Sequence, residues 1–294
     1  MKLADLLKGV EVTEFKAPPE LEIADVCYDS RRAAADTLFV AVRGFESDGH
    51  RYIYAAAAKG AVCAVCEEPP ECDIPYVIVP DSRLALALIS VNYFRSPASE
   101  MVMMGVTGTN GKTTTTYLLK HILEVCMDAK VGLIGTNGNM IGDEFLPTER
   151  TTPESYELQK LLREMADAGC THVVMEVSSH SLALDRVAGI TYDCGIFTNL
   201  TQDHLDFHHD MSDYAEAKAL FHEPLRRHKP GRRVVAVHAQ PCPVPLHDLL
   251  AQGQPGRRVR PGHPLHQRLG ELPRRVQDGR RARHAAHPGH LLGI

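Results

Sequence analysis

Residues 101–115 read MVMMGVTGTNGKTTT. The apolar run 101–106 is typical of a strand that is buried on both faces of a parallel sheet. A glycine-rich turn follows, and the pattern after it predicts a helix from Lys112 to about Cys126. Between a buried strand and a helix N-terminus, backbone N–H groups of such a turn point at phosphate oxygens, and the helix dipole favours their charge. The stretch therefore predicts a phosphate-binding loop.

The residue types of this loop suit a nucleoside triphosphate. Lys112 is expected on the β- and γ-phosphates, and the hydroxyl of Thr113 on Mg²⁺. Val106 occupies the first glycine position of the usual G-x-x-x-x-G-K-[ST] pattern, but the strand–turn–helix context favours the same function. A glycine-rich turn without a ligand would not explain Lys-Thr at this offset. The predicted nucleotide-binding residues are Gly108, Thr109, Asn110, Gly111, Lys112, Thr113 and Thr114.

Strands and helices alternate after this loop. The apolar runs that predict strands are 130–134, 172–177 and 193–198. One helix is expected to begin after a capping Thr152, and another is expected from a capping Ser212 to about His222. The first of these helices has one apolar face at helical spacing, made by Leu158, Leu161, Leu162, Met165 and Ala168. This alternation predicts an α/β fold with a doubly wound, mostly parallel sheet.

The first 95 residues form a pattern of their own. The expected strands are 22–28, 37–42, 61–66 and 76–79, and the expected helices are 50–59 and 82–94. Ser82 is expected to cap the second helix. This predicts a small α/β domain, followed by a polar, proline-containing linker at 95–100. The predicted domains are residues 1–95, 96–240 and 241–294.

The last of these segments differs from the rest in composition. Residues 241–294 hold nine Arg, no Lys, three acidic residues, eight Pro, seven Gly and no aromatic residue. Such a segment cannot bury enough apolar surface to offset chain entropy, so we expect it to be disordered. One interpretation is a basic tail that binds nucleic acid. The favoured one is a GC-rich gene read out of frame beyond residues 223–240, because such misreading yields Arg, Pro, Gly, His and Ala.

The composition of the whole chain excludes several classes of protein. Its 294 residues carry a net charge of −5, which argues against a general nucleic-acid binder. No apolar run approaches the ~18–20 residues of a membrane helix. The first residues, MKLADLLKGVEVTEF, hold acids where a signal peptide would be apolar. Eight cysteines are too sparse for a disulfide scaffold, so we expect reduced thiols in the cytoplasm.

Two further residues are expected to join the phosphate-binding loop. Glu176 ends one expected strand, and His204 follows another. The carboxyl ends of strands in a doubly wound sheet face the ligand crevice, so both are expected near the phosphates as Mg²⁺ ligands. Taken singly, a Glu or His at the end of a strand is more often a structural or surface residue. The phosphate-binding loop in the same sheet favours metal binding.

Three other features are less specific. Cys63 and Cys66 lie in an expected strand, where positions three apart point to opposite faces, so buried core thiols are favoured over a redox or zinc pair. The run from His208 to Asp210 resembles a metal cluster, but a solvated approach to the next helix is favoured. Composition alone predicts an exposed side chain for Lys218.

Taken together, these stretches resemble the motifs of the Mur ligases. The motifs are GTNGKTTT (108–115), RTTP (150–153), MEVSSHSL (175–182) with Arg186, FTNLTQDHLDFH (197–208) and YAEAKALF (214–221). Near the N-terminus, YDSRR (28–32) and LFVAVRGFESDGHRYI (38–53) are similar to the uridine-nucleotide domain of that family. The resemblance covers residues 20–222 in order. GTNGKT alone would also fit the folylpolyglutamate synthases.

The resemblance implies ATP-dependent amide-bond formation in the synthesis of a peptidoglycan precursor. The substrates would be UDP-MurNAc-L-Ala-D-Glu and a diamino acid, either meso-diaminopimelate or L-lysine. The γ-phosphate of ATP would pass to the side-chain carboxylate of the D-Glu, and the diamino acid would then attack the acyl phosphate. Lys112 and Mg²⁺ would supply positive charge between the two negative reactants. The family also implies a cytoplasmic enzyme that is a monomer.

The resemblance assigns roles to residues of this chain. Thr113 and Glu176 would hold one Mg²⁺, and His204 with a carbamylated Lys218 would hold a second. The catalytic residues would be Lys112, Glu176, His204 and Lys218. The muramoyl peptide would bind Thr151, Thr152, Ser178 and Arg186, and the uridine end would bind Tyr28, Ser30, Phe45, Glu46 and Ser47.

The sequence also departs from the family. A third, C-terminal domain with a DNP-type signature is expected in these ligases and is not found here, so we expect weak or no turnover from this chain. Two alternatives stay open. A folylpolyglutamate-synthase-like ligase is disfavoured by the uridine-type N-terminal pattern. A non-catalytic nucleotide-binding protein would leave Glu176, His204 and Lys218 without a role.

Overall fold

The computed structural model describes residues 1–44, 47–204 and 207–221. The first part holds a five-stranded sheet of order β1-β5-β4-β3-β2. Its strands are β1 (Glu14–Lys16), β2 (Asp25–Cys27), β3 (Thr37–Val40), β4 (Ala61–Cys66) and β5 (Tyr76–Ile78). Its helices are α1 (Leu3–Leu6), the 3₁₀ helix η1 (Gly49–Tyr52), α2 (Ile53–Ala58) and α3 (Ser82–Tyr93). All neighbouring strands are parallel except β1, which is antiparallel to β5.

The four strands and two helical patterns expected here are all present, but two elements were not predicted. β1 and α1 have three and four residues, too few to show a hydrophobic period. The cap of α3 was also assigned to the wrong residue. Asp81 caps this helix by accepting hydrogen bonds from the backbone N–H groups of Arg83 and Leu84. The hydroxyl of Ser82 donates instead to Glu67.

The second part holds a six-stranded sheet of order β11-β6-β10-β7-β8-β9. Its strands are β6 (Val102–Thr107), β7 (Val131–Gly135), β8 (Gly138–Ile141), β9 (Glu144–Leu146), β10 (His172–Glu176) and β11 (Cys194–Phe197). β11, β6, β10 and β7 are parallel, which confirms the predicted sheet. β8 and β9 extend one edge as an antiparallel hairpin that the sequence pattern did not reveal.

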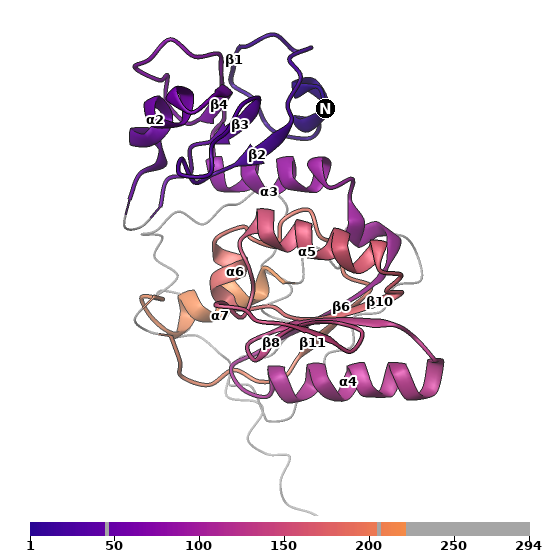
Figure 1. Cartoon of the computed structure of the whole chain (residues 1–294). Helices are drawn as coiled ribbons and strands as arrows, with labels where there is room; N and C mark the ends of the chain where they lie inside the picture. The colour runs from indigo at the N-terminus through magenta and orange to yellow at the C-terminus, as the bar shows by residue number, and fades with distance from the viewer. Residues whose placement is uncertain (45–46, 205–206, 222–294) are drawn as a thin grey trace, which may run out of the picture. The chain divides into compact units, whose positions relative to one another are not determined.

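Helices cover both faces of this sheet. Figure 1 shows α4 (Lys112–Met127) on one face, and α5 (Ser155–Asp167), α6 (Ser179–Ala183) and α7 (Met211–Ala219) on the other. The expected linker at 95–100 contains a 3₁₀ helix, η2 (Pro97–Glu100), preceded by Arg95 and Ser96 in the left-handed region. The boundaries of the predicted domains stay predictions, and residues 241–294 lie outside the described residues.

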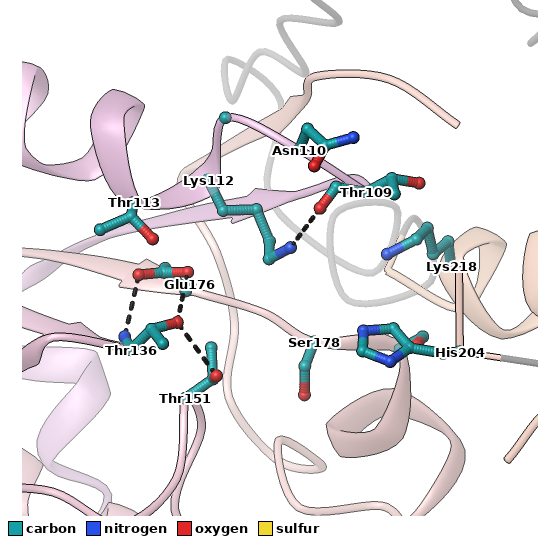
Figure 2. Close-up of a pocket in the computed structure, with 12 residues that line it drawn as sticks. Thr109, Asn110, Lys112, Thr113, Thr136, Thr151, Glu176, Ser178, His204 and Lys218 are labelled. Carbon is teal, nitrogen blue, oxygen red and sulfur yellow. Dashed lines mark hydrogen bonds between the residues drawn. The ribbon is translucent and has the colours of Figure 1, made fainter. Parts of the chain in front are cut away.

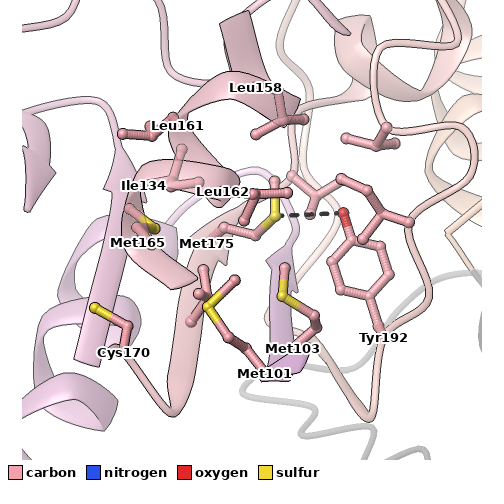
Figure 3. Packing of buried hydrophobic residues seen from close by; sticks show 14 of the residues in the cluster. Met101, Met103, Ile134, Leu158, Leu161, Leu162, Met165, Cys170, Met175 and Tyr192 are labelled. Carbon is pink, nitrogen blue, oxygen red and sulfur yellow. Dashed lines mark hydrogen bonds between the residues drawn. The ribbon is translucent and has the colours of Figure 1, made fainter. Parts of the chain in front are cut away.

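The apolar face of α5 packs on the second sheet as its spacing predicts (Figure 3). Leu158, Leu162 and Met165 are fully buried there against Met103 and Met175 of the sheet. Ala168, which was expected on the same face, is exposed because the helix ends at Asp167. The residues of this cluster that Figure 3 labels are Met101, Met103, Ile134, Leu158, Leu161, Leu162, Met165, Cys170, Met175 and Tyr192.

The predicted caps of α5 and α7 are also wrong. The N-cap position of α5 is Glu154, and the hydroxyl of Thr152 donates 2.9 Å to the backbone oxygen of Glu176. Asp210, not Ser212, caps α7 by accepting from the backbone N–H groups of the next turn. For α5, a tertiary partner engages the hydroxyl of Thr152. For α7, the side chain of Asp210 reaches the backbone N–H groups of the first turn.

Two cysteines of β4 were expected in the core of the first part. Cys63 and Cys66 are free thiols buried in two different apolar clusters on opposite faces of the first sheet, which confirms the prediction of core residues. Burial raises the pKa of each thiol to about 12, so both are protonated and unreactive at neutral pH.

Within the described residues, no helix has the length and apolar character needed to span a membrane.

Candidate active site

A polar pocket of about 320 Å³ opens where the parallel strands of the second sheet end (Figure 2). The turn after β6 and the start of α4 form one side, and the ends of β7 and β10 form the other. α7 and the segment before it close the pocket. The lining residues are Thr109, Asn110, Gly111, Lys112, Thr113, Thr136, Thr151, Glu176, Ser178, Ser179, His204 and Lys218.

The turn after β6 has a backbone that requires glycine. Gly108 and Gly111 have φ angles of +136° and +84°, which side chains rarely tolerate. A Cβ atom on Gly108 would also lie 2.0 Å from Oγ1 of Thr198. The turn is held in place from the end of β11, since the backbone oxygen and side-chain oxygen of Asn199 accept hydrogen bonds from it. The turn thus has the strand–turn–helix arrangement that the sequence predicts, with the N-terminus of α4 directed at the pocket, which is an arrangement suited to phosphate binding.

Two ammonium groups converge on one carbonyl of this loop. Nζ of Lys112 lies 2.9 Å from the backbone oxygen of Gly108, and Nζ of Lys218 lies 3.0 Å from the same oxygen. Lys218 is only 2% exposed and also lies over the ring of Tyr214, so the predicted exposed side chain is wrong. Burial, reinforced by the charge of Lys112, lowers the pKa of Lys218 to about 7. Burial likewise lowers the pKa of Lys112.

Glu176 faces these lysines from the end of β10 (Figure 2). Its side chain is fully buried, and its two oxygens accept hydrogen bonds from the backbone N–H and the hydroxyl of Thr136. That hydroxyl lies 3.0 Å from the hydroxyl of Thr151. The buried carboxylate is therefore held in one orientation toward the loop, as its position at a strand end predicts.

This donor set suits one Mg²⁺ ion. The hydroxyl of Thr113 and the carboxylate of Glu176 line the same pocket, and Mg²⁺ in nucleotide sites is commonly held by one or two such oxygens together with phosphates. His204 and Lys218 do not suit a cation while Lys218 is an ammonium group. Among the described residues, no cluster of three or more His, Cys, Asp or Glu side chains is arranged to hold a metal ion.

The segment before α7 corrects one expectation. His208 is 1% exposed, so the stretch from His208 to Asp210 is not a solvated approach to the helix throughout. Its ring lies 5.8 Å from that of His180 and 5.1 Å from that of Tyr214, measured between centroids. Burial lowers the pKa of His208, which favours the neutral ring. His208 therefore has a packing position beside the pocket.

The pocket brings together ten of the residues that the sequence analysis selected. Of the others, Gly108 and Thr114 flank the same loop, and Thr152 and Arg186 lie just outside the pocket, where Nη1 of Arg186 is 3.4 Å from the backbone oxygen of Thr152. Tyr28, Ser30 and Ser47 belong to the first sheet's loops and do not line it. Phe45 and Glu46 lie outside the described residues.

Two lining residues were missed. Thr136 directly follows β7, so the rule that placed Glu176 at a strand end would also have selected it. Ser179 begins α6 next to Ser178, whose hydroxyl caps this helix by accepting from the backbone N–H of Ser181. Nothing in the sequence alone marked Ser179, because serine has a polar role at many helix starts.

Comparison with known families agrees with this geometry. The profile of the Mur ligase middle domain matches residues 106–243. The profile described as the Mur ligase family catalytic domain matches residues 22–104. This chain belongs to the Mur ligase family. The first matched segment contains the turn between β6 and α4, and the second contains β2 to β5 of the five-stranded sheet.

Curated relatives of this chain share one description. A UDP-N-acetylmuramoyl-L-alanyl-D-glutamate–2,6-diaminopimelate ligase of Caldanaerobacter subterraneus subsp. tengcongensis is 50% identical over 223 residues, which are 74% of this chain and 45% of the relative. A ligase with the same description from Clostridium tetani is 46% identical over 225 residues, 75% of this chain and 46% of the relative. This Mur ligase chain thus spans about half the length of the curated relatives it matches.

Solved structures agree with the fold. A structure described as a UDP-N-acetylmuramoyl-L-alanyl-D-glutamate–2,6-diaminopimelate ligase superposes with a TM-score of 0.67 at 23% identity, over 81% of this chain and 52% of that one. A MurF ligase of Thermotoga maritima in complex with ADP superposes with a TM-score of 0.50 at 21% identity, over 74% and 45% of the two chains. At these identities the likeness concerns the Mur ligase fold.

Proposed function

We propose that this Mur ligase chain takes part in ATP-dependent amide-bond formation on UDP-MurNAc-L-Ala-D-Glu, with a diamino acid as the incoming amine. The observation that carries the proposal is the convergence of two ammonium groups, of the half-buried Lys112 and the buried Lys218, on the phosphate-binding loop opposite the buried carboxylate of Glu176. The described function of relatives that are 45–50% identical supports the choice of substrate. ATP is the nucleotide, as the ADP complex of the Thermotoga maritima MurF supports.

The chemistry explains why such a pocket is needed. A carboxylate is a poor electrophile, so the γ-phosphoryl group of ATP is first transferred to the side-chain carboxylate of the D-Glu residue, and ADP leaves. The amine then attacks the acyl carbon and phosphate leaves, which forms the amide. The first step joins two anions, and Lys112 together with the loop N–H groups stabilises the negative charge between them.

Thr113 and Glu176 would hold one Mg²⁺, which would supply further positive charge on the phosphates when bound. His204 and Lys218 would form the second metal site only after Lys218 has lost its positive charge. The neutral amine of Lys218 can attack CO₂, which forms an N–C bond, releases one proton and leaves a carbamate anion. A pKa of about 7 leaves a large share of this amine neutral at physiological pH.

Carbamylation of Lys218 is directly measurable. With ¹³C-labelled bicarbonate at pH 8, we expect a Lys218 carbamate resonance in the ¹³C NMR spectrum of the chain, separate from that of the terminal amino group, because burial lowers the pKa of Lys218 to about 7. The resonance should be lost in Lys218→Met and kept in Lys160→Met, which changes an exposed lysine of α5. A spectrum of Lys218→Met that keeps every carbamate resonance of the wild type would contradict this assignment.

The other substrate contacts extend the same proposal. Thr151 and Ser178 line the pocket, while Thr152 and Arg186 adjoin it, and we assign these four residues to the muramoyl peptide. Tyr28, Ser30 and Ser47, with Phe45 and Glu46, are assigned to the uridine end. We further propose that the protein acts in the cytoplasm as a monomer.

Calorimetric titration with UDP-MurNAc-L-Ala-D-Glu tests the function. We expect saturable binding that is lost in Arg186→Ala and in Ser30→Ala, because these residues lie on the two parts of the chain that would hold the ligand. Binding is chosen over turnover because the chain spans about half the length of its relatives. Absence of binding by a chain with a native circular dichroism spectrum would exclude this substrate. A folylpolyglutamate-type ligand would then be tested, although the match over residues 22–104 disfavours it.

A further inference from the structure

Three arginines surround one carboxylate beside the pocket. Glu154, at the N-cap of α5, lies 2.8 Å from Nη1 of Arg150 and 2.6 Å from Nε of Arg186. Nη1 of Arg83, at the start of α3, lies 3.9 Å from its other oxygen. Among the ion pairs of the described residues, none gives any of these arginines a second carboxylate. The cluster therefore holds three positive charges against one negative charge.

Three of the four charged side chains in this cluster are largely buried rather than solvated. The side chains of Glu154, Arg186 and Arg83 are 12%, 15% and 22% exposed. Nε of Arg186 is buried and makes no hydrogen bond with good geometry, although it lies close to Glu154. Burial, and then repulsion from Arg150 and Arg83, lower the pKa of Arg186 against the attraction of Glu154. Like charges in a partly buried position repel strongly, so a second anion would stabilise the cluster.

The position of the cluster indicates which anion fits. Arg150 directly precedes Thr151, which lines the pocket, and Arg186 contacts the backbone oxygen of Thr152. A substrate residue with two carboxylates could present one of them to the γ-phosphate. Its other carboxylate would then lie on the side of the pocket where the arginines are. The terminal D-Glu of the proposed substrate has two carboxylates, of which one reacts. A planar guanidinium group matches a carboxylate with paired hydrogen bonds.

We propose that Arg83 and Arg150, together with Arg186, bind the non-reacting carboxylate of the substrate's terminal acidic residue, and that Glu154 is the internal counter-ion of this site in the ligand-free chain. The inference rests on the proposed function, and it adds Arg83, Arg150 and Glu154 to the substrate site. Because Arg83 belongs to α3 and the other residues to the second part of the chain, the carboxylate would also link the two parts.

Binding of two ligands to matched variants tests the inference. UDP-MurNAc-L-Ala-D-Glu and UDP-MurNAc-L-Ala are titrated into the wild type, Arg83→Gln and Arg150→Gln. We expect each variant to lose about tenfold in affinity for the first ligand, the size of one charge-assisted hydrogen bond, and to bind the second as the wild type does. Arg163→Gln, which breaks comparable ion pairs with Glu100 and Asp167, is the control and should change neither affinity.

Replacing Glu154 by glutamine should change the affinity for the substrate in the opposite direction. Loss of the competing carboxylate should strengthen binding of UDP-MurNAc-L-Ala-D-Glu several-fold while lowering Tm, since three arginines then lack a counter-ion. Glu164→Gln, at the exposed pair with Lys160, should do neither. Unchanged or weaker binding by a folded Glu154→Gln would overturn its role as counter-ion. If this variant does not fold, Arg150→Gln decides, because Arg150 is 54% exposed and its loss leaves the core intact.

The remaining outcomes separate this inference from the proposed function. If the wild type binds neither ligand, the proposed function fails. If the wild type binds the full ligand and the arginine variants bind it equally well, only the present inference fails. Equal losses for both ligands would assign the arginines to the diphosphate and would overturn the carboxylate assignment.

Discussion

Replacing Lys218 by methionine is expected to raise the free energy of unfolding of the ligand-free chain by roughly 2–4 kcal/mol at pH 6.5. The physical reason is the cost of holding an ammonium group at 2% exposure beside the charge of Lys112. The pKa of Lys218 falls from its ordinary 10.5 to about 7 in the folded chain. Loss of the hydrogen bond to Gly108 and of the contact with Tyr214 offsets part of the gain.

The stability gained in Lys218→Met should depend on pH, which a change in packing alone would not explain. Between about pH 7 and 10.5 the unfolded chain binds more protons at this position than the folded one, so the stability of the wild type rises with pH across that window. The advantage of Lys218→Met should therefore be complete below pH 7 and vanish toward pH 10.5. A stabilisation that does not change with pH would have another origin.

Urea unfolding followed by circular dichroism measures both effects. The buffers are freed of CO₂, Mg²⁺ and nucleotide, because a carbamate would remove the same positive charge. Lys160→Met is the matched control, since its ammonium group is 54% exposed and its removal should change stability little. A destabilised Lys218→Met at pH 6.5 would contradict the prediction. The same variant should lose the carbamate, so stability and the proposed activity change in opposite directions.

Replacing Lys112 by methionine is expected to weaken ATP binding by at least about 100-fold. The ammonium group of Lys112 donates to the backbone oxygens of Gly108 and Thr109, at 2.9 and 2.8 Å, so it lies inside the loop. Phosphate oxygens would replace these neutral acceptors by charged ones in a partly buried position. Each charge-assisted hydrogen bond is worth about 1.5–3 kcal/mol. Methionine keeps most of the length of the side chain but cannot donate a hydrogen bond.

Calorimetric titration with ATP and Mg²⁺ measures this loss. Lys160→Met again provides a lysine change remote from the loop, and its ATP affinity should equal that of the wild type. A Lys112→Met chain that binds ATP within about threefold of the wild type would show that Lys112 does not contact the phosphates. A native circular dichroism spectrum of the variant would exclude unfolding as the cause. We expect such a spectrum, because Lys112 is only half-buried at the start of α4 and belongs to no apolar cluster there.

Several features of this protein could be predicted from short stretches of sequence. The buried strand, glycine turn and Lys-Thr pair at 101–115 specify the phosphate-binding loop, because φ angles, hydrogen bonding and helix start are all decided within about ten residues. Glu176 could be placed by the general rule for strand ends in parallel sheets. The apolar spacing of α5 predicted its buried face for the same local reason.

Helix caps and edge strands show the limit of such reasoning. Ser82, Thr152 and Ser212 all have suitable side chains, yet Asp81, Glu154 and Asp210 occupy the cap positions. A hydroxyl group makes its hydrogen bond with whichever partner the fold brings near, as Thr152 does with Glu176. The β8–β9 hairpin was missed because a sheet edge needs little apolar periodicity.

The sequence by itself therefore determined the α/β fold, the family and the glycine-rich turn between β6 and α4, all of which rest on local patterns and on motifs in a fixed order. The tertiary structure alone decided that Lys218 is buried beside Lys112 and that Arg83, Arg150 and Arg186 share one carboxylate. The physical reason is that charge density and burial depend on side chains from separate elements. Residues more than 100 positions apart make the Lys218–Gly108 contact, and no local pattern encodes that distance.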